Sequence, residues 1–348
     1  MSEDPIIRAV ATAVPAHALS QADVKAWAAR RFNGRAAAMD RLLPAFDNAG
    51  IDTRYSCVPL DWYDTAPGWR DKNALYIKHA TGLAADAAER CLAAAGVAAA
   101  EVDCLVTVST SGIATPSLDA RLLSEMDFRP DTQRLPVFGL GCAGGVLGMG
   151  RAADLARARQ GRLVLLVVVE LCGLTFRSRD RSKSNVIASA LFGDGAAAAL
   201  LSTAGDGPAI TGWGEHTWPD SLGVMGWSVE DDGLGVVFSR DIPTIVRRDF
   251  AAAVAAYLAD GALTLDDVDG FICHPGGAKV VDALEEVFGC TDRGLDLTRR
   301  TLRDFGNMSA ASVMFVLEQS LAAARPGRYL MTALGPGFTA GFATIRMP

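Results

Sequence analysis

Cys142 is the residue of this chain whose surroundings are most typical of a nucleophile. It lies in Gly141-Cys142-Ala143-Gly144-Gly145, after an apolar run at Leu135–Phe138 that we expect to be a strand. We expect a helix to begin at Cys142 and to end near Ala158. Free backbone N–H groups and the dipole at a helix N-terminus stabilise a thiolate, the nucleophilic form of cysteine. The alternative is a small buried thiol, which we expect for four other cysteines: Cys57, Cys91, Cys104 and Cys290.

His274 is the candidate acid–base group. It follows a predicted strand at Gly270–Cys273 and precedes Pro275-Gly276-Gly277. A histidine at the carboxyl end of a strand, on a glycine-rich turn, is well placed to exchange protons with a ligand at the sheet edge. The alternative is a hydrogen bond to loop backbone. The three other histidines lack such a placement: His17, His79 and His216.

Asn307 precedes another predicted helix, in Phe305-Gly306-Asn307-Met308-Ser309. Asparagine at this position usually caps the helix. Opposite a cysteine and a histidine, its side-chain amide could instead donate a hydrogen bond to a developing oxyanion.

An internal repeat relates the two parts of the chain. The segment Leu92–Asp103 resembles Leu258–Asp269, and each precedes a predicted strand; the offset is 258 − 92 = 166. Gly161-Arg162 recurs as Gly327-Arg328 with the same offset, 327 − 161 = 166. We interpret this as a duplicated α/β half, with an N-terminal half at 1–205 and a C-terminal half at 206–348. Two unrelated α/β units are the alternative.

The repeat has a chemical consequence. Adding 166 to 142 gives 308, so Cys142 and Asn307 lie one residue from equivalent positions. Equivalent helix starts of two similar halves can face each other across a pseudo-twofold axis. The sequence therefore predicts one site built from both halves.

Short apolar runs alternate with helical segments beyond residue 100. Continuous apolar runs bounded by glycine indicate a sheet buried on both faces. We predict its strands at Cys104–Val108, Leu135–Phe138, Leu163–Val169, Ala196–Leu201, Gly270–Cys273, Tyr329–Ala333 and Phe342–Ile345. We predict the first 100 residues to be mostly helical, with helices at Gln21–Arg31 and Asn73–Ala95 and a loop at Leu60–Arg70.

Composition bounds the function classes. The chain has 348 residues, 50% hydrophobic and 21% charged, with net charge 33 − 40 = −7. Its mean hydropathy of +0.21 indicates an ordered globular protein and excludes disordered and collagen-like chains. The acidic balance argues against general binding of nucleic acid or anionic membranes. Seven cysteines, no secretory signal and no apolar run near the ~20 residues of a membrane span predict a cytoplasmic protein.

The motifs around Cys142, His274 and Asn307 together resemble those of type III polyketide synthases, the chalcone synthase-like family. Further segments match in the same order. Glu170–Arg177 resembles the segment beside the acyl pocket, and Ala190–Ala196 resembles the segment with a gatekeeper phenylalanine, here Phe192. Gly335-Pro336-Gly337-Phe338 is similar to the C-terminal loop that shapes the cavity. The resemblance extends over nearly the whole chain from about Arg54.

This resemblance implies a thiolase-like αβαβα fold, a homodimer and a reaction. Cys142, paired with His274, would take the acyl group of an acyl-CoA starter. Malonyl-CoA would lose CO₂, with His274 and Asn307 stabilising the enolate, which attacks the acyl group in a Claisen condensation. No metal or other cofactor is implied beyond the CoA substrates.

Further residues are assigned by the same resemblance. Cys172 stands where plant members have a threonine, and Thr110 matches a cavity position. Thr115 matches a position that often reaches the partner's cavity. Arg54 lies near the CoA-contacting segment and is a candidate phosphate contact. The stretch Met225–Pro243 is similar to bacterial alkylpyrone and alkylresorcinol synthases, which predicts a fatty acyl starter and a pyrone or resorcinol product.

Two other functions fit part of the sequence. A ketoacyl synthase III-like enzyme of fatty-acid initiation also uses Cys, His and Asn, but differs after the histidine, where this chain has Pro275-Gly276-Gly277. An NAD(P)-binding dehydrogenase would explain Gly139-Leu-Gly-Cys-Ala-Gly144, which fits G-x-G-x-x-G after a strand. That second alternative leaves His274, Asn307 and the repeat unexplained.

Overall fold

The computed structural model describes residues 4–32, 42–290 and 294–348. Its main sheet has the strand order β11-β12-β13-β8-β1-β7-β6-β4-β5. The strands of its first part are β1 (Ile6–Ala13), β4 (Cys104–Val108), β5 (Gln133–Val137), β6 (Val164–Leu171) and β7 (Asp194–Ser202). Those of its second part are β8 (Ala209–Thr217), β11 (Gly270–Cys273), β12 (Gly327–Gly335) and β13 (Thr339–Met347).

The two parts repeat one topology. The order β1-β7-β6-β4 in one corresponds to β8-β13-β12-β11 in the other. In both, the strand pairs β4–β6 and β11–β12 are parallel and the next pairs, β6–β7 and β12–β13, are antiparallel. A single residue pair, Ile6 with Ala209, joins the parts. Position 205/206, where the sequence divides the halves, lies in the connection between β7 and β8, and that division stays a prediction.

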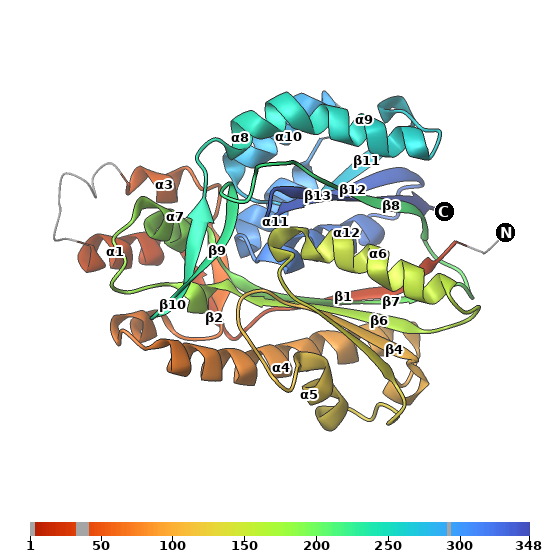
Figure 1. Ribbon diagram of the computed structural model, residues 1–348, viewed down its shortest axis with the longest axis horizontal. Helices are drawn as coiled ribbons and strands as arrows, with labels where there is room; N and C mark the ends of the chain where they lie inside the picture. Colours follow the sequence, from red (N-terminus) through yellow and green to blue (C-terminus); the bar gives the residue numbers. More distant parts are fainter. Residues whose placement is uncertain (1–3, 33–41, 291–293) are drawn as a thin grey trace.

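Helices form three layers around the two parts of the sheet (Figure 1). The outer face of the first part is covered by α4 (Trp69–Ala95) and α5 (Leu118–Glu125). The outer face of the second part is covered by α9 (Ala251–Asp260) and α10 (Ala278–Phe288). Between the parts lie α6 (Gly144–Arg157) and α12 (Ser312–Ala322). The result is the αβαβα order of a thiolase-like fold, as the sequence predicted.

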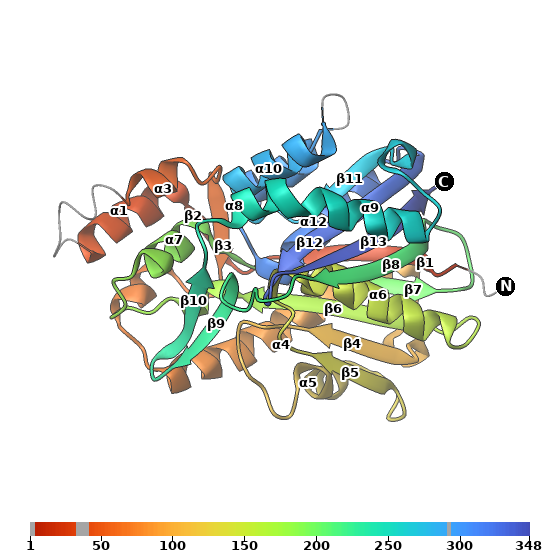
Figure 2. The same ribbon diagram turned by 45° about the horizontal axis from the view of Figure 1, so that its top comes forward.

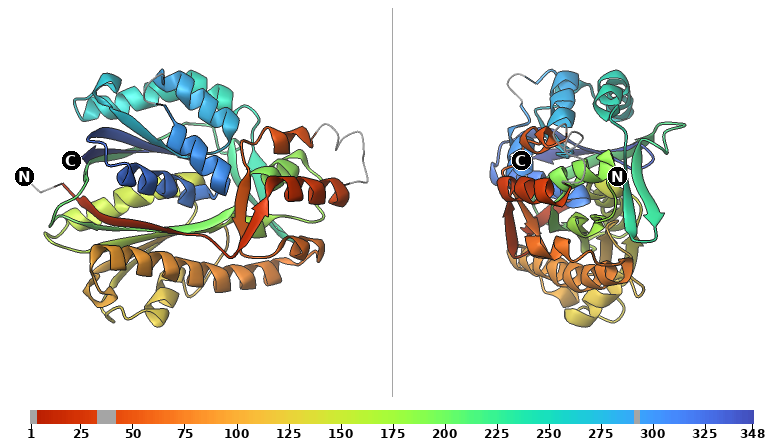
Figure 3. Two further views of the ribbon diagram at one scale, coloured as in Figure 1. Left: turned by 180° about the vertical axis from the view of Figure 1, so that it is seen from behind. Right: turned by 90° about the vertical axis from the view of Figure 1, so that its left-hand side faces the viewer.

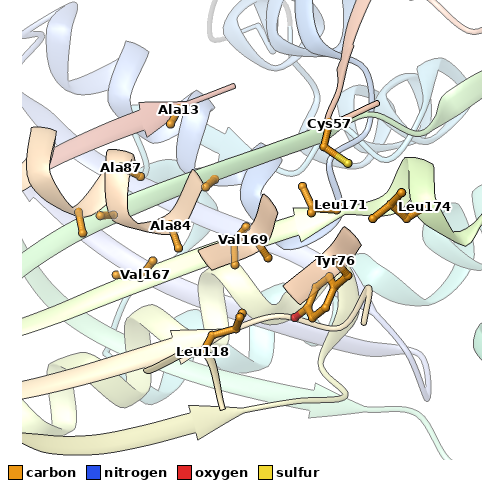
Figure 4. Close-up of a cluster of buried hydrophobic side chains, with 14 of the residues drawn as sticks. Ala13, Cys57, Tyr76, Ala84, Ala87, Leu118, Val167, Val169, Leu171 and Leu174 are labelled. Carbon is orange, nitrogen blue, oxygen red and sulfur yellow. The ribbon is translucent and has the colours of Figure 1, made fainter. Parts of the chain in front are cut away.

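The apolar strands contribute side chains to two hydrophobic cores, one on each face of the sheet. In β6, Leu165, Val167 and Val169 pack under α4. Figure 4 shows Val167 and Val169 near Ala84 and Ala87 of that helix. The alternate residues, Val164, Leu166 and Val168, pack against the central helices. Successive side chains of a strand point to opposite faces, so a strand buried on both faces is apolar throughout.

The remaining elements gather at the end of the sheet that carries the site, as Figures 2 and 3 show. Two antiparallel strand pairs lie there, β2 (His17–Ser20) with β3 (Thr53–Ser56), and the hairpin of β9 (Met225–Glu230) and β10 (Gly233–Phe238). The helices of this end are α1 (Gln21–Arg31), α3 (Pro44–Asp47), α7 (Lys183–Leu191), α8 (Ile242–Ile245) and α11 (Asp296–Phe305).

Three predictions about local structure are wrong. The first 100 residues are not mostly helical, because Ile6–Ala13 forms β1, which pairs antiparallel with β7. The predicted loop at Leu60–Arg70 contains a 3-10 turn at Leu60–Asp64 and the first residues of α4. The helix expected from Cys142 begins at Gly144 and ends at Arg157.

Candidate active site

Cys142 lies in a one-turn 3-10 helix, Gly141–Ala143, between β5 and α6, and it is 8% exposed. Glycine is required at its neighbour Gly141, which has φ +45° and where a Cβ would lie 2.5 Å from the Pro336 ring. The Gly141 N–H donates to the Thr110 hydroxyl at 3.1 Å. These contacts fix the turn that presents the thiol.

Ser309 and Glu170 contact this turn from other elements. The Ser309 hydroxyl lies near the Cys142 thiol, where it lowers the pKa of that thiol, and it lies 3.5 Å from Glu170 Oε1. Glu170 ends the apolar part of β6, is fully buried, and its Oε2 accepts the N–H groups of Thr110 and Ser111 at 3.0 and 2.9 Å. Both residues were missed in the sequence. An acidic residue directly after Leu163–Val169 was the available signal, since a carboxylate beside a buried strand needs partners.

Asn307 is held on both sides of its amide. Its Oδ1 accepts the Ser309 N–H at 2.8 Å, and its Nδ2 donates to the Gly276 carbonyl at 3.1 Å. An amide nitrogen has two N–H groups, so this arrangement uses one of them and fixes the direction of the other.

His274 follows β11 and is 6% exposed. Its backbone N–H donates to the Thr332 carbonyl at 2.9 Å, and its own carbonyl accepts the Gly276 N–H at 3.0 Å. Within the described parts of the chain, its buried Nδ1 has no hydrogen-bond partner. Gly276 thus connects His274 to Asn307, and Ser309 connects Asn307 to Cys142. Backbone and Asn307 side-chain hydrogen bonds thus connect the turns that carry His274, Asn307 and Ser309, and Ser309 lies near Cys142.

Burial controls the charges in this arrangement. The pKa of Cys142 is raised to about 12, mainly by loss of water; the Ser309 hydroxyl lowers it and the nearby Glu170 carboxylate raises it by smaller amounts. Burial also lowers the pKa of His274 to about 3. Desolvation therefore outweighs the helix-start effect that the sequence suggested, and the resting pair is a neutral thiol and a neutral imidazole.

Phe192 and Cys172 line a pocket next to these residues. Cys172 begins a 3-10 turn at Cys172–Thr175, and Phe192 follows α7 and is 8% exposed. The Phe192 ring lies 5.9 Å from that of Trp227 and 5.7 Å from that of Phe238, on β9 and β10. The pocket is mostly apolar and is lined in addition by Leu19, Val24, Trp27, Arg54, Tyr55, Ser56, Leu60, Tyr63, Gly173, Thr175, Phe176, Asn185, Ala188, Ser189 and Val236.

The two glycines of the C-terminal loop have different positions. A Cβ on Gly335 would lie 2.5 Å from the Leu140 carbonyl oxygen and 2.8 Å from the Ala143 nitrogen, so Gly335 packs directly against the Cys142 turn. Gly337 has φ +68°, and its carbonyl accepts the Ser221 hydroxyl at 2.7 Å. Gly337 therefore contacts the segment that precedes β9 and does not pack against the Cys142 turn.

Arg54 lies inside the protein, 4% exposed. Its guanidinium donates to the backbone carbonyls of Ser189, Ala190 and Phe192. This burial leaves its side chain no path to a phosphate at the surface, so the geometry does not favour the CoA contact that the sequence suggested.

Metal and membrane features were searched over residues 4–32, 42–290 and 294–348. No three His, Cys, Asp or Glu side chains in these ranges gather as a metal site would require. No helix in the same ranges has the length and apolar character needed to cross a membrane.

Comparison with known proteins identifies the family. Residues 3–205 match the N-terminal domain and residues 214–344 the C-terminal domain of chalcone and stilbene synthases. A 1,3,6,8-tetrahydroxynaphthalene synthase of Streptomyces peucetius subsp. caesius is 38% identical over 98% of this chain and 92% of its own length. An alpha-pyrone synthesis polyketide synthase-like protein of Mycobacterium tuberculosis is 28% identical over 96% of this chain and 89% of its own length.

A solved structure agrees with these matches. The crystal structure of the 1,3,6,8-tetrahydroxynaphthalene synthase of Streptomyces coelicolor A3(2), described as a bacterial type III polyketide synthase, superposes with a TM-score of 0.94. It is 26% identical, and the match covers 98% of this chain and 99% of that one. Membership in this family excludes the dehydrogenase and the ketoacyl synthase III-like alternatives. The chain belongs to the chalcone and stilbene synthase family of type III polyketide synthases, which are acyl-transferring condensing enzymes.

Proposed function

We propose that Cys142, His274 and Asn307 carry the condensation and that acyl-CoA and malonyl-CoA are the substrates. The observation that supports this most is the hydrogen-bonded path from Ser309, whose hydroxyl lies near the Cys142 thiol, through the Asn307 amide to the His274 loop. It unites a nucleophile, a base and an amide donor from both halves beside a mostly apolar pocket.

The first step loads the starter. The Cys142 sulfur attacks the thioester carbonyl of acyl-CoA, its proton passes to His274 Nε2, and CoA leaves as the thiolate, which takes up a proton from solvent. Because burial makes both resting groups neutral, the proton moves as the sulfur–carbon bond forms. The backbone N–H of Cys142 is the proposed donor to the oxyanion of this tetrahedral intermediate.

The second step extends the chain. Malonyl-CoA loses CO₂, and the electron pair of the broken C–C bond becomes the enolate of a thioester. Hydrogen bonds from His274 Nε2–H and the free Asn307 N–H would stabilise the enolate oxygen. The enolate carbon then attacks the acyl carbon, and Cys142 leaves as thiolate and takes its proton back from His274. These steps use only the named side chains and the two CoA thioesters.

The walls of the pocket favour an apolar starter. Phe192, Trp27 and Phe176 line it together with Cys172. Buried apolar surface near a nucleophile favours an alkyl chain over a charged acyl group. We therefore propose a fatty acyl starter and an alkylpyrone or alkylresorcinol product, with Phe192, Cys172, Thr110, Gly335 and Gly337 shaping the space in which the product forms.

Mass spectrometry of products tests this assignment. The enzyme is supplied with malonyl-CoA and a panel of acyl-CoA starters, and the alkyl products are expected only with intact Cys142. Cys142→Ala should abolish acylation of the protein, seen by intact mass. Acyl transfer unchanged in Cys142→Ala would disprove the site, whereas products built from malonyl units alone would disprove the fatty starter.

We further propose a cytoplasmic homodimer. The six buried cysteines of the described chain form no disulfide bonds, which suits a reducing compartment; they are Cys57, Cys91, Cys104, Cys142, Cys172 and Cys273. The edge strand β5 lies at one end of the main sheet, and two large apolar side chains near it, Ile113 and Phe138, are 48% and 61% exposed. Thr115 lies in the same loop region and is the proposed contact with the partner's cavity. The net charge of −7 gives no reason to propose nucleic acid as a partner.

A further inference from the structure

Arg54 is a buried cation that the proposed reaction does not use. It lies in β3, and its two terminal nitrogens donate to carbonyls of one short segment: Ser189 at 2.7 Å, Ala190 at 2.7 Å and Phe192 at 3.0 Å. One of these nitrogens also donates to Gln21 Oε1. Gln21 in turn donates from Nε2 to the Ala190 and Phe46 carbonyls, at 3.1 and 3.0 Å.

The same segment holds Asn307 on its other side. The backbone N–H of Asn307 donates to the Leu191 carbonyl at 2.9 Å, and the backbone N–H of Gly193 donates to the backbone carbonyl of Asn307 at 2.9 Å. Phe192 lies between these two bonds and pairs with Asn307 as a parallel bridge. The turn at 189–193, which we call the Phe192 turn, therefore connects the Arg54 guanidinium to the backbone of Asn307.

The chemistry of arginine suits this position. Its planar fork can donate to several carbonyls at once, which a lysine ammonium or an apolar side chain cannot reproduce. The fully buried Asp194 carboxylate, which accepts the Cys57 and Gly173 N–H groups at 2.9 and 2.7 Å, provides nearby negative charge. Burying a guanidinium carries a large desolvation cost, and an apolar side chain would fill the space without it. What arginine adds is a defined geometry for the turn.

We infer that Arg54 is a positioning residue, which fixes the Phe192 turn and thereby the placement of the Asn307 amide and the Phe192 ring. This inference rests on the proposed role of Asn307 in stabilising the malonyl-derived enolate. Displacing a positioned group by about 1 Å can cost about 10² in rate. Decarboxylation should fall more than loading of Cys142, because the Cys142 turn is held by contacts to Thr110 and Pro336.

A double-mutant cycle tests the inference. Malonyl-CoA decarboxylation and Cys142 acylation are measured for Arg54→Met, Asn307→Ala and the double variant. We expect Arg54→Met to lower decarboxylation roughly ten- to a hundredfold and to lower acylation of Cys142 by a smaller factor, since Phe192 also lines the proposed starter pocket. In the Asn307→Ala background, Arg54→Met should have little further effect, because two residues that act through one group are not additive. Arg54→Lys should recover part of the rate, since an ammonium can reach some of the carbonyls.

A matched control separates positioning from general destabilisation. Arg157 lies at the far end of α6, where it donates to Asp4 at 2.9 Å and lies 4.4 Å from the Trp213 ring centroid. Arg157→Met should lower the melting temperature without changing decarboxylation. If Arg54→Met does not fold, Gln21→Leu removes an acceptor of the guanidinium and takes its place in the cycle.

The outcomes distinguish this inference from the proposed function. Full decarboxylation in Asn307→Ala would disprove the proposed role of Asn307. A loss in Asn307→Ala together with normal decarboxylation in folded Arg54→Met would overturn the positioning role alone. Independent, multiplying losses in the double variant would also overturn it, because they would show a general effect on the fold.

Discussion

Glu170 shows how a single buried carboxylate can support a reaction in which it has no direct step. It accepts two backbone N–H groups of the loop that carries Thr110, and it lies next to the Ser309 hydroxyl. Thr110 and Ser309 in turn contact the Cys142 turn and its sulfur. Glu170, at the end of β6, therefore contacts both the loop that carries Thr110 and the Ser309 hydroxyl, and these two groups lie next to the Cys142 turn.

The charge of Glu170 should make stability depend on pH. Burial raises its pKa to about 7, from an ordinary value of 4.5. Between these values the folded state binds more protons than the unfolded state, so the free energy of unfolding falls as pH rises from about 5 to 7, by up to roughly 3 kcal/mol. Glu170→Gln removes this pH-dependent contribution to the free energy of unfolding. Relative to the parent, the variant should gain stability between pH 5 and pH 8 in urea unfolding.

A surface carboxylate serves as the control. The Arg247 guanidinium lowers the pKa of Glu286, so Glu286 is ionised in both folded and unfolded states above about pH 5.5. The effect of Glu286→Gln on unfolding should therefore be constant from pH 5.5 to pH 8. A constant effect of Glu170→Gln over the same range would show that Glu170 is already ionised in the folded protein.

At the scale of elements, close contact between the two halves depends on glycine. Gly145 lies in the first turn of α6, where a Cβ would lie 2.4 Å from the Ala310 carbonyl oxygen and 2.6 Å from Val313 Cγ1. Ala310 directly follows Ser309. Because Gly145 has no side chain, the first turn of α6, next to Cys142, can lie close to the segment around Ala310, which follows Asn307.

Gly145→Ala should separate these two helix starts. Overpacking of this kind costs about 1–3 kcal/mol of unfolding free energy, and condensing activity should fall with it. Gly82→Ala is the matched control, because Gly82 lies within α4 and a Cβ there meets no atom within 4 Å. Gly82→Ala should stabilise the protein by about 0.5–1 kcal/mol. If both variants unfold at the same urea concentration as the parent, the close approach is not needed for stability.

The elements that sequence analysis found and missed differ in burial. β4 and β11 were predicted residue for residue, because strands covered by helices on both faces are continuous apolar runs. β8, β9 and β10 were missed; much of β8 and β9 is only half-buried or exposed, so their polar residues obscure the pattern. β1, with Arg8 and Thr12 among apolar residues, lies in a segment predicted to be mostly helical.

The residues of the candidate site also fall into those that the sequence indicated and those that it did not. Cys142, His274 and Asn307 were found because each stands beside a local signal, a strand end or a helix start. Ser309 and Glu170 were missed because their importance arises from contacts between residues 139 positions apart. Arg54 was expected to contact a CoA phosphate because it lies near the segment that resembles the family's CoA-contacting segment, and only the fold shows the carbonyls that surround it.

At the scale of the whole molecule, the sheet ends on one side in an unprotected strand. β5 pairs with β4 along one edge, and its residues are exposed or half-buried. The unpaired backbone groups of an edge strand bind a further strand readily unless it is covered or charged. Exposed Phe138 and Ile113 lie at this edge, so a second copy of the chain would cover both the backbone and the apolar side chains.

The proposed homodimer should therefore be broken at Phe138. Light scattering after size-exclusion chromatography is expected to give twice 36.5 kDa for the parent and the single mass for Phe138→Asp, because a charge buried without a partner costs several kcal/mol, on the order of 3–5. Leu222, 85% exposed on another part of the surface, supplies the control, and Leu222→Asp should remain a dimer. A monomeric parent would exclude the homodimer, whereas a dimer that persists in Phe138→Asp but dissociates in Leu222→Asp would place the interface on a different face.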